Sequence, residues 1–349
     1  MVAHPQATSV VAGPAFAGTL LDAARSRTAA SPHHVRVRLG GACVDVRFDG
    51  PGSAGALLPA WRPLIVDPDD EAAMAATPEA TLHVLTADAS GPSPAAPWGR
   101  AIEAAHAASH EALEFFDLAG TVGLWEASAR TGVWWAPRPE TFTVHDRIQP
   151  LLPLLRWALR GADRPVLRAG LVGSARGGLL IAGGPGSGRS TTVLAARRLG
   201  LAALSDAATV VAPGELRGFP LTGYATATTR TIALLPELMS RLAPLPRTPL
   251  GQQAVVLDAR PLRATDGMPL RAVVVVRLGD LAGAPLRILP QDAAAAVLPA
   301  LTPMLPGTRP VDLRLAATLA DALPVYGLTV GPEVDAVAGA LARILRDQA

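Results

Sequence analysis

The residues of this chain best suited to chemistry form the glycine-rich stretch Gly183–Ser190, which reads GGPGSGRS. Gly183, Gly188 and Ser190 match the phosphate-binding pattern G-x-x-x-x-G-K-[ST], and Arg189 stands where that pattern has lysine. Glycines let the backbone curl until successive N–H groups point at one anion, and the start of a following helix adds positive partial charge. The stretch therefore predicts a phosphate-binding loop made of Gly183, Gly184, Gly186, Ser187, Gly188, Arg189, Ser190 and Thr191.

Two side chains of this loop have expected roles towards a nucleotide. We expect Arg189 to contact the phosphates of ATP and Ser190 to offer its hydroxyl to Mg²⁺. Arginine binds phosphate, but its planar guanidinium is bulkier than the ammonium it replaces, and the two are not interchangeable. These residues therefore favour phosphate binding more strongly than phosphoryl transfer.

The chain contains no lysine, and this gives Arg189 a second interpretation. All 31 basic residues are arginine. A replacement of lysine throughout the chain would place arginine at position 189 whatever the site does, whereas a loss of activity would remove that lysine selectively. The sequence leaves both interpretations open.

Asp206 is the second candidate residue, because it follows a predicted strand after the loop and its helix. An aspartate in this position could hold Mg²⁺ through water or accept a proton from a hydroxyl substrate. The alternative is a residue that caps a turn. We predict that Asp206 and Arg189 are catalytic, and that Asp206 and Ser190 are metal ligands.

These residues require a strand, a loop and a helix in that order. The apolar run 179–182 predicts a buried strand, and 190–199 predicts a helix that Gly200 ends. Two short strands are expected within 201–211, on either side of Asp206. The other elements expected in this half are strands at 270–277 (fully buried) and 325–330, and helices at 291–298, 308–323 and 333–346.

The first half of the chain predicts a small α+β domain. Alternating runs at 35–39 and 44–48 around two glycines predict a β-hairpin, and 122–125 with 133–135 predicts another. We expect a helix over 101–118. The other elements are a strand at 82–86, a loop at 91–97 and a helix at 151–159 ended by Gly161.

The predicted fold class is therefore α/β. It has a P-loop nucleotide-binding core with a central mixed sheet, preceded by a smaller α+β domain. Residues 1–33 are expected to be a flexible or helical lead, 34–150 the small domain, and 151–349 the P-loop domain.

The helix expected over 101–118 offers a weaker candidate site. Glu103, His106, His110 and Glu114 would share one face at spacings of three and four, and imidazole and carboxylate both bind divalent metals. A solvated polar face is the commoner reason for such a pattern.

Composition excludes several classes of protein. The net charge is only +2, and no arginine-rich run is interleaved with aromatic residues, so a nucleic-acid partner is not expected. The single cysteine excludes an internal disulfide and suits a cytoplasmic protein. No run of 18 apolar residues is present, so we expect no membrane span, and the absence of arginine before Arg25 argues against a signal peptide.

Residues from about 120 to 349 resemble the HPr serine kinase/phosphorylase C-terminal-domain-like proteins, which include small serine kinases encoded beside peptide-maturation genes. The loop is the most specific match, and the others count through their order along the chain. The matching segments are Leu167–Gly173, Gly183–Thr192, Leu204–Asp206, Gly223–Thr228, Leu270–Arg277 and Leu323–Leu328.

The resemblance implies a core that binds ATP and Mg²⁺ and transfers the γ-phosphoryl group to a serine hydroxyl of a peptide or small protein. It is also compatible with a homo-oligomer. The family usually has His at 168, Lys at 189, Asp at 207 and Lys at 228, where this chain has Arg168, Arg189, Ala207 and Thr228. The family's paired aspartates divide the base and metal roles, so Asp206 would serve both.

Three hypotheses follow from the sequence. The first is an ATP-dependent serine kinase. The second is a pseudokinase-like protein that binds a nucleotide or phosphate and acts through a partner. In the third, the glycine loop is only a structural turn, although its place between a strand and a helix argues against this.

Overall fold

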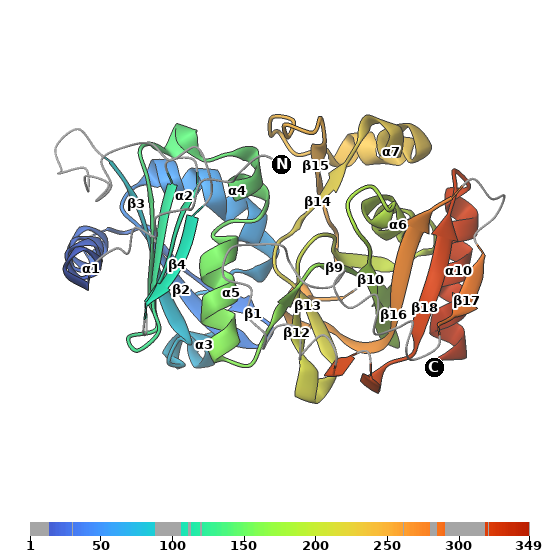
Figure 1. The fold of residues 1–349 in the computed structure, drawn as a ribbon, viewed down its shortest axis with the longest axis horizontal. Helices are drawn as coiled ribbons and strands as arrows, with labels where there is room; N and C mark the ends of the chain where they lie inside the picture. The colour runs from blue at the N-terminus through green and yellow to red at the C-terminus, as the bar shows by residue number, and fades with distance from the viewer. Residues whose placement is uncertain are drawn as a thin grey trace, which may run out of the picture.

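The structure is a computed structural model that describes residues 14–29, 31–87, 106–110, 113–118, 121–260, 262–279, 285–289, 318–319 and 321–348. Two mixed β-sheets with helices packed against them make this an α/β chain (Figure 1). The predicted α/β class is therefore confirmed.

The first sheet has seven strands in the order β1-β2-β3-β7-β6-β5-β4. Its β1–β2 and β6–β7 pairs are antiparallel and confirm both predicted hairpins, while β3 runs parallel to both β2 and β7. The strands are β1 (His34–Leu39), β2 (Ala42–Phe48), β3 (Ala80–Thr86), β4 (His106–His110), β5 (Leu113–Leu118), β6 (Thr121–Glu126) and β7 (Thr131–Ala136).

The helix predicted over 101–118 is wrong where the structure describes this segment. Strands β4 and β5 pair with each other, and β5 pairs with β6, so the segment extends the sheet by two strands. Pairing with an existing strand outweighs the helical preference of a short run rich in alanine and glutamate. The helix face that would join His106, His110 and Glu114 therefore does not exist, and Glu103 lies outside the described residues.

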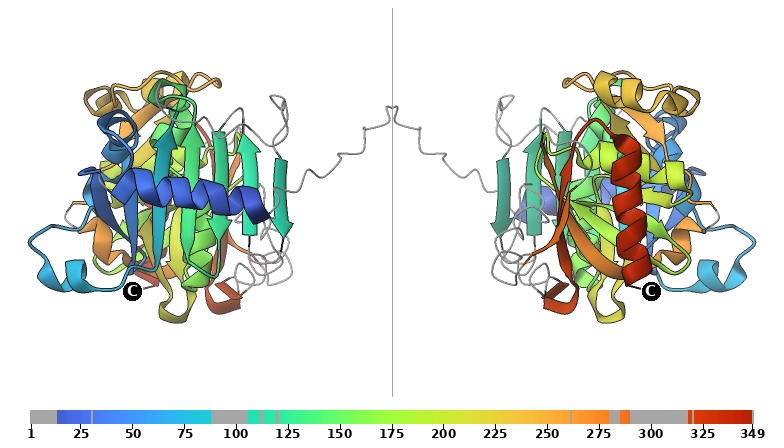
Figure 2. Two further views of the ribbon diagram at one scale, coloured as in Figure 1. Left: turned by 90° about the vertical axis from the view of Figure 1, so that its left-hand side faces the viewer. Right: turned by 90° about the vertical axis from the view of Figure 1, so that its right-hand side faces the viewer.

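Helices cover both faces of the first sheet. Helix α1 (Pro14–Ala29) crosses its outer face in Figure 2, where Leu20, Leu21 and Ala24 pack on Leu85 and Val133. This agrees with a helical form of the predicted lead. The elements on or beside the other face are α2 (Pro51–Leu57), η1 (Leu58–Leu64), α3 (Glu71–Ala75), η2 (Pro139–Thr141), α4 (Val144–Ile148) and α5 (Leu152–Gly161).

The second sheet has nine strands, in the order β11-β9-β10-β16-β13-β12-β8 with β18 and β17 continuing from β16. Strands β10, β16 and β18 are parallel, and β9 is antiparallel to β10. The strands are β8 (Val166–Leu167), β9 (Ala169–Ser174), β10 (Gly177–Ala182), β11 (Ala202–Ser205), β12 (Thr209–Ala212), β13 (Arg217–Pro220), β16 (Met268–Leu278), β17 (Leu286–Ile288) and β18 (Val325–Val330).

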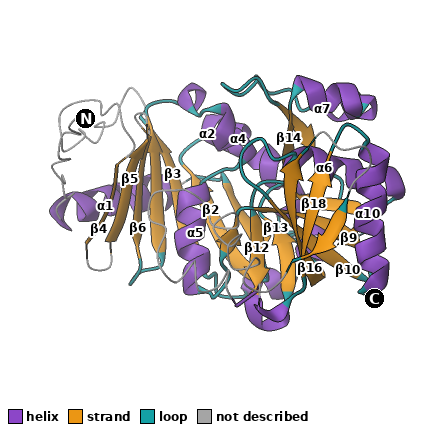
Figure 3. Cartoon of the chain, turned by 45° about the vertical axis from the view of Figure 1, so that its right-hand side comes forward, coloured by secondary structure: helices purple, strands orange, loops and turns teal. Residues whose placement is uncertain are grey.

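A two-stranded sheet of β14 (Tyr224–Ala227) and β15 (Gln253–Val256) lies with α7 (Thr229–Leu234) beyond the second sheet, next to α6 (Figure 3). Helix α10 (Val334–Asp347) covers the far end of the molecule (Figure 2). The remaining elements are α6 (Arg189–Ala195), η3 (Ala196–Leu199), η4 (Pro213–Glu215), η5 (Pro236–Arg241) and η6 (Ala264–Asp266).

Most elements predicted for the second half are confirmed. Helix α6 continues into η3 and ends at Gly200, whose φ of 76° is the left-handed conformation that glycine favours. Strand β16 is buried over its centre, although Val275 is only partly so. The loop predicted at 91–97, the helix at 291–298 and most of the helix at 308–323 lie outside the described residues.

The largest hydrophobic cluster joins the two halves of the chain. Trp61, which precedes residue 150, packs in one cluster with Leu155 and Phe219, which follow it. The predicted division at residue 150 therefore crosses a shared core. Within the described residues, every helix is too short or too polar to cross a membrane.

Candidate functional site

The predicted loop lies between β10 and α6, at the carboxyl ends of three parallel strands. Beyond β10 come β16 and β18, which end at Leu278 and Val330. Both residues lie near Gly188, since a Cβ on that glycine would be 2.7 Å from Val330 Cγ2 and 3.6 Å from Leu278 Cδ1. Ligands commonly bind at this edge of α/β sheets.

Two loop positions require glycine. Gly188 has φ +88°, in the left-handed region, and it has no room for a side chain beside Val330. At Gly183, a Cβ would lie 2.3 Å from Ser187 Oγ. The loop conformation therefore depends on the same glycines that the phosphate-binding pattern specifies.

A cavity of about 700 Å³ opens in front of this loop. Loop residues Gly184–Thr192 form one wall, and residues from α4, α5, β8, α7, β18 and α10 form the others. Three arginines and a histidine line it, namely Arg168, Arg189, Arg230 and His145, and no aspartate or glutamate does so among the described lining residues. The cavity therefore suits an anionic ligand.

Arg189 is held at the start of the loop. Its Nη1 donates to the carbonyl oxygen of Gly183 at 3.2 Å. Its Nε is buried without a hydrogen-bond partner within the described part of the chain, as is Ser187 Oγ. Buried polar groups normally find partners, and both of these residues line the cavity.

Arg168, the residue before β9, lies beside the first residue of the loop. Ala169 pairs with Ala182 across the β9–β10 ladder, so Arg168 stands opposite Gly183. Burial lowers the pKa of Arg168 from its ordinary value, and the nearby Arg189 guanidinium lowers it further. The two positive groups are therefore neighbours at the first residue of the loop.

Asp206 follows β11 and is 1% exposed. Its Oδ2 accepts hydrogen bonds from the backbone nitrogen of Thr226 at 3.0 Å and from Thr226 Oγ1 at 3.3 Å. Its Oδ1 is buried and has no partner among the described residues. Ala207 and Thr226 line the cavity whereas Asp206 does not, so its carboxylate lies behind the cavity wall.

A threonine chain connects the loop to α7. Thr228 caps that helix by accepting from the backbone nitrogen of Thr231 at 3.1 Å. Thr231 Oγ1 shares hydrogen bonds with Thr228 Oγ1 at 3.0 Å and with Thr191 Oγ1 at 2.8 Å. Thr228 therefore has a structural role at the position where the resembling family has lysine.

The predicted loop residues line one cavity, Ser190 and Thr191 included, except Gly183, which is not in its lining. Sequence reasoning missed His145, Arg230, Thr231 and Gln252, which also line it. Thr228, which also lines the cavity, can be recognised in the sequence as a helix cap. No local sequence pattern marks the four missed residues. The described residues hold no group of three or more His, Cys, Asp or Glu able to bind a metal, so Ser190 and Asp206 would need a ligand's oxygens or water to complete a magnesium site.

Comparisons with known proteins give this site no further identity. No protein-family model matches the chain, and no curated protein matches its sequence.

Proposed function

We propose that this chain binds ATP in the cavity in front of Gly183–Ser190 and belongs to the HPr-kinase-like proteins that it resembles. The proposal rests on one observation: this cavity is lined by three arginines, and no carboxylate lines it among the described residues. The phosphates of a nucleotide would neutralise that charge through charge-assisted hydrogen bonds. In this proposal, residues 151–349 form a P-loop core and residues 34–150 a smaller α+β domain.

The residues present fit a magnesium nucleotide. Arg189 and Ser187, which both line the cavity, would bond phosphate oxygens. The Ser190 hydroxyl would bind Mg²⁺ directly, and Asp206 would contact it through water, because Mg²⁺ retains several waters and prefers oxygen ligands. Bound Mg²⁺ would neutralise phosphate charge.

Binding, as in a pseudokinase-like partner protein, is the function that the geometry supports best. Asp206 stands behind the cavity wall with one oxygen occupied by Thr226. Ala207 offers no second carboxylate, and Thr228 is engaged in capping α7. These residues supply a pocket, and of the two residues predicted to be catalytic only Asp206 could act as a base.

Transfer to a serine hydroxyl is the second candidate, and the free Oδ1 of Asp206 favours it. A buried carboxylate oxygen without a partner is costly unless something binds it. In a kinase, Oδ1 would take the proton from the acceptor hydroxyl as that oxygen bonds to the γ-phosphorus, while the bond from the γ-phosphorus to the bridging oxygen breaks and ADP leaves. Arg189 would hold the phosphates.

Calorimetry with ATP and Mg²⁺ tests the binding proposal. We expect the full chain to bind, and Gly188→Asp to lose binding because it adds a negative side chain at a crowded, left-handed position. Gly214→Asp is the control. Gly214 has open space around it, and its φ lies outside the left-handed region, so the position does not require glycine. Absence of wild-type binding would contradict both nucleotide functions and leave the loop as a structural turn.

ATP turnover separates the two candidates. A binding protein should convert no measurable ATP to ADP above the level of Asp206→Asn. A kinase should show slow turnover with water as acceptor, and Asp206→Asn should abolish it while ATP binding persists. The control is Asp266→Asn, because Asp266 lies in η6 and does not line the cavity.

A further inference from the structure

Arg168 differs from the other cationic residues of the cavity in its position, because it lies between β8 and β9. It stands opposite Gly183 through the β9–β10 register, beside Arg189, which itself bonds the Gly183 carbonyl. No hydrogen bond or ion pair of the Arg168 side chain occurs within the described residues. A half-buried guanidinium beside another guanidinium is unfavourable until an anion binds between them, and no aspartate or glutamate is among the described residues that line the cavity.

The order of the strands distinguishes the two sides of the loop. In the sequence β9-β10-β16-β18, the loop follows β10, so Arg168 lies on one side of it and the ends of β16 and β18 lie on the other. On that second side the wall is apolar, made of Leu278, Val330, Val334 and Val337. On the Arg168 side the wall also has apolar residues, among them Val166 and Leu167, but it carries the Arg168 guanidinium and Thr226, whereas the second side has no such polar group. A nucleotide lying along the loop would place its base on the apolar side and its last phosphate beside Arg168.

We propose that Arg168 binds the terminal phosphate of the nucleotide and so makes the cavity select a triphosphate over a diphosphate. This inference rests on the proposed function and deepens it. Arg189 contacts the loop and is positioned for the inner phosphates, while Arg168 reaches past it on the β9 side. The planar fork of arginine suits two oxygens of one phosphate.

The test compares a triphosphate with a diphosphate on the full chain. Calorimetry in Mg²⁺ uses ADP and the non-hydrolysable β,γ-imido analogue of ATP, so that turnover cannot disturb the measurement. We expect wild type to bind the triphosphate more tightly. Arg168→Gln should weaken triphosphate binding by about tenfold or more and change ADP binding little, since a charge-assisted contact is lost at the last phosphate only. Arg168→Lys should restore part of the preference because it keeps the charge.

Arg176→Gln is the matched control, because Arg176 is an exposed arginine at the opposite end of the same β9–β10 hairpin. It should leave both affinities unchanged. Retained ADP binding by Arg168→Gln also reports that the variant is folded. Equal loss of both nucleotides, or loss of neither, would overturn the assignment of Arg168 while leaving ATP binding intact. Failure of wild type to bind either nucleotide would instead overturn the proposed function, and this inference with it.

Discussion

At the scale of single residues, the site differs from a complete kinase site through particular hydrogen bonds. The Thr228 hydroxyl forms hydrogen bonds with the backbone of α7 and with the Thr231 hydroxyl. One carboxylate oxygen of Asp206 accepts a hydrogen bond from Thr226. Arg168 adds charge on the side of the loop where the resembling family has histidine. The substitutions together enlarge the positive charge available to an anion and reduce the means of moving a proton.

The cap at Thr228 can be tested on its own. Thr228→Ala removes the acceptor for the Thr231 backbone nitrogen and one hydroxyl of the threonine chain. Loss of such a cap lowers the free energy of unfolding by about 1 kcal/mol. Urea denaturation should show this decrease, whereas Thr265→Ala, which loses only a surface hydrogen bond to Asp266, should stay within a few tenths of 1 kcal/mol. Equal midpoints for the two variants would contradict the capping role.

At the scale of elements, the loop and its flanking strand and helix are encoded locally, whereas the neighbours of the loop are not. The glycines, the apolar run of β10 and Gly200 suffice to predict strand, loop and helix. Arg168 comes opposite Gly183 only through the pairing of β9 with β10, which a linear pattern does not contain. The same limit explains the wrong prediction at 101–118, where β5 pairs with β6 and the described residues form strands instead of a helix.

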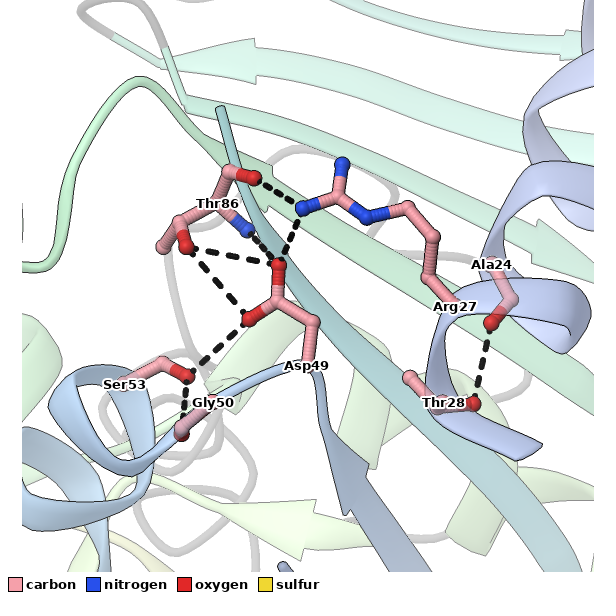
Figure 4. Close-up of polar contacts among 7 residues, drawn as sticks. All are labelled: Ala24, Arg27, Thr28, Asp49, Gly50, Ser53 and Thr86. Carbon is pink, nitrogen blue, oxygen red and sulfur yellow. Dashed lines mark hydrogen bonds and ion pairs between the residues drawn. The ribbon is translucent and has the colours of Figure 1, made fainter. Parts of the chain in front are cut away.

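Helix α1 offers a test of how an element far from the cavity is attached. Arg27 Nη2 donates to Asp49 Oδ2 at 2.6 Å and to the Thr86 carbonyl at 2.5 Å, and the Thr86 nitrogen donates to the same carboxylate at 2.6 Å (Figure 4). Asp49 is nearly buried, with 5% of its side chain exposed. Arg27 therefore joins α1 to the ends of β2 and β3 and compensates a desolvated charge.

Arg27→Gln should lower the free energy of unfolding by about 2 kcal/mol, because it leaves the Asp49 carboxylate without its cation. It should also make α1 cleave faster in limited proteolysis. Asp22→Asn is the control, since Asp22 is exposed and its ion pair with Arg25 stays within α1. Equal proteolysis rates for the two variants would show that hydrophobic packing alone holds α1 in place.

At the scale of the whole molecule, the cavity depends on both halves of the chain. His145 and Ile148, which precede residue 150, line the cavity together with loop residues that follow it, and the cluster around Trp61 and Phe219 joins the two halves. Sequence patterns predicted the main elements on each side, but they could not predict this shared core or the cavity beside it. Both arise from contacts between residues far apart along the chain.

The stability of this shared fold should depend on pH through His83. His83 lies in β3, is 3% exposed and shares a 2.7 Å hydrogen bond with Thr28 of α1. Burial lowers the pKa of His83 to about 4, with smaller contributions from the positive charges of Arg47 and Arg25. The unfolded histidine titrates near 6.5, so the unfolded chain binds more protons than the folded chain between these two values.

Lowering the pH from 6.5 to 4 should therefore favour unfolding, while the contribution of His83 is fully present above pH 6.5. The loss from this one residue approaches about 3 kcal/mol at the acid end. Urea denaturation at pH 7.5, 6.5 and 5 should show wild type losing stability across this range and His83→Leu losing less. His33→Gln, at a residue outside the buried core, should follow wild type. An equal slope for wild type and His83→Leu would assign the acid sensitivity to other groups.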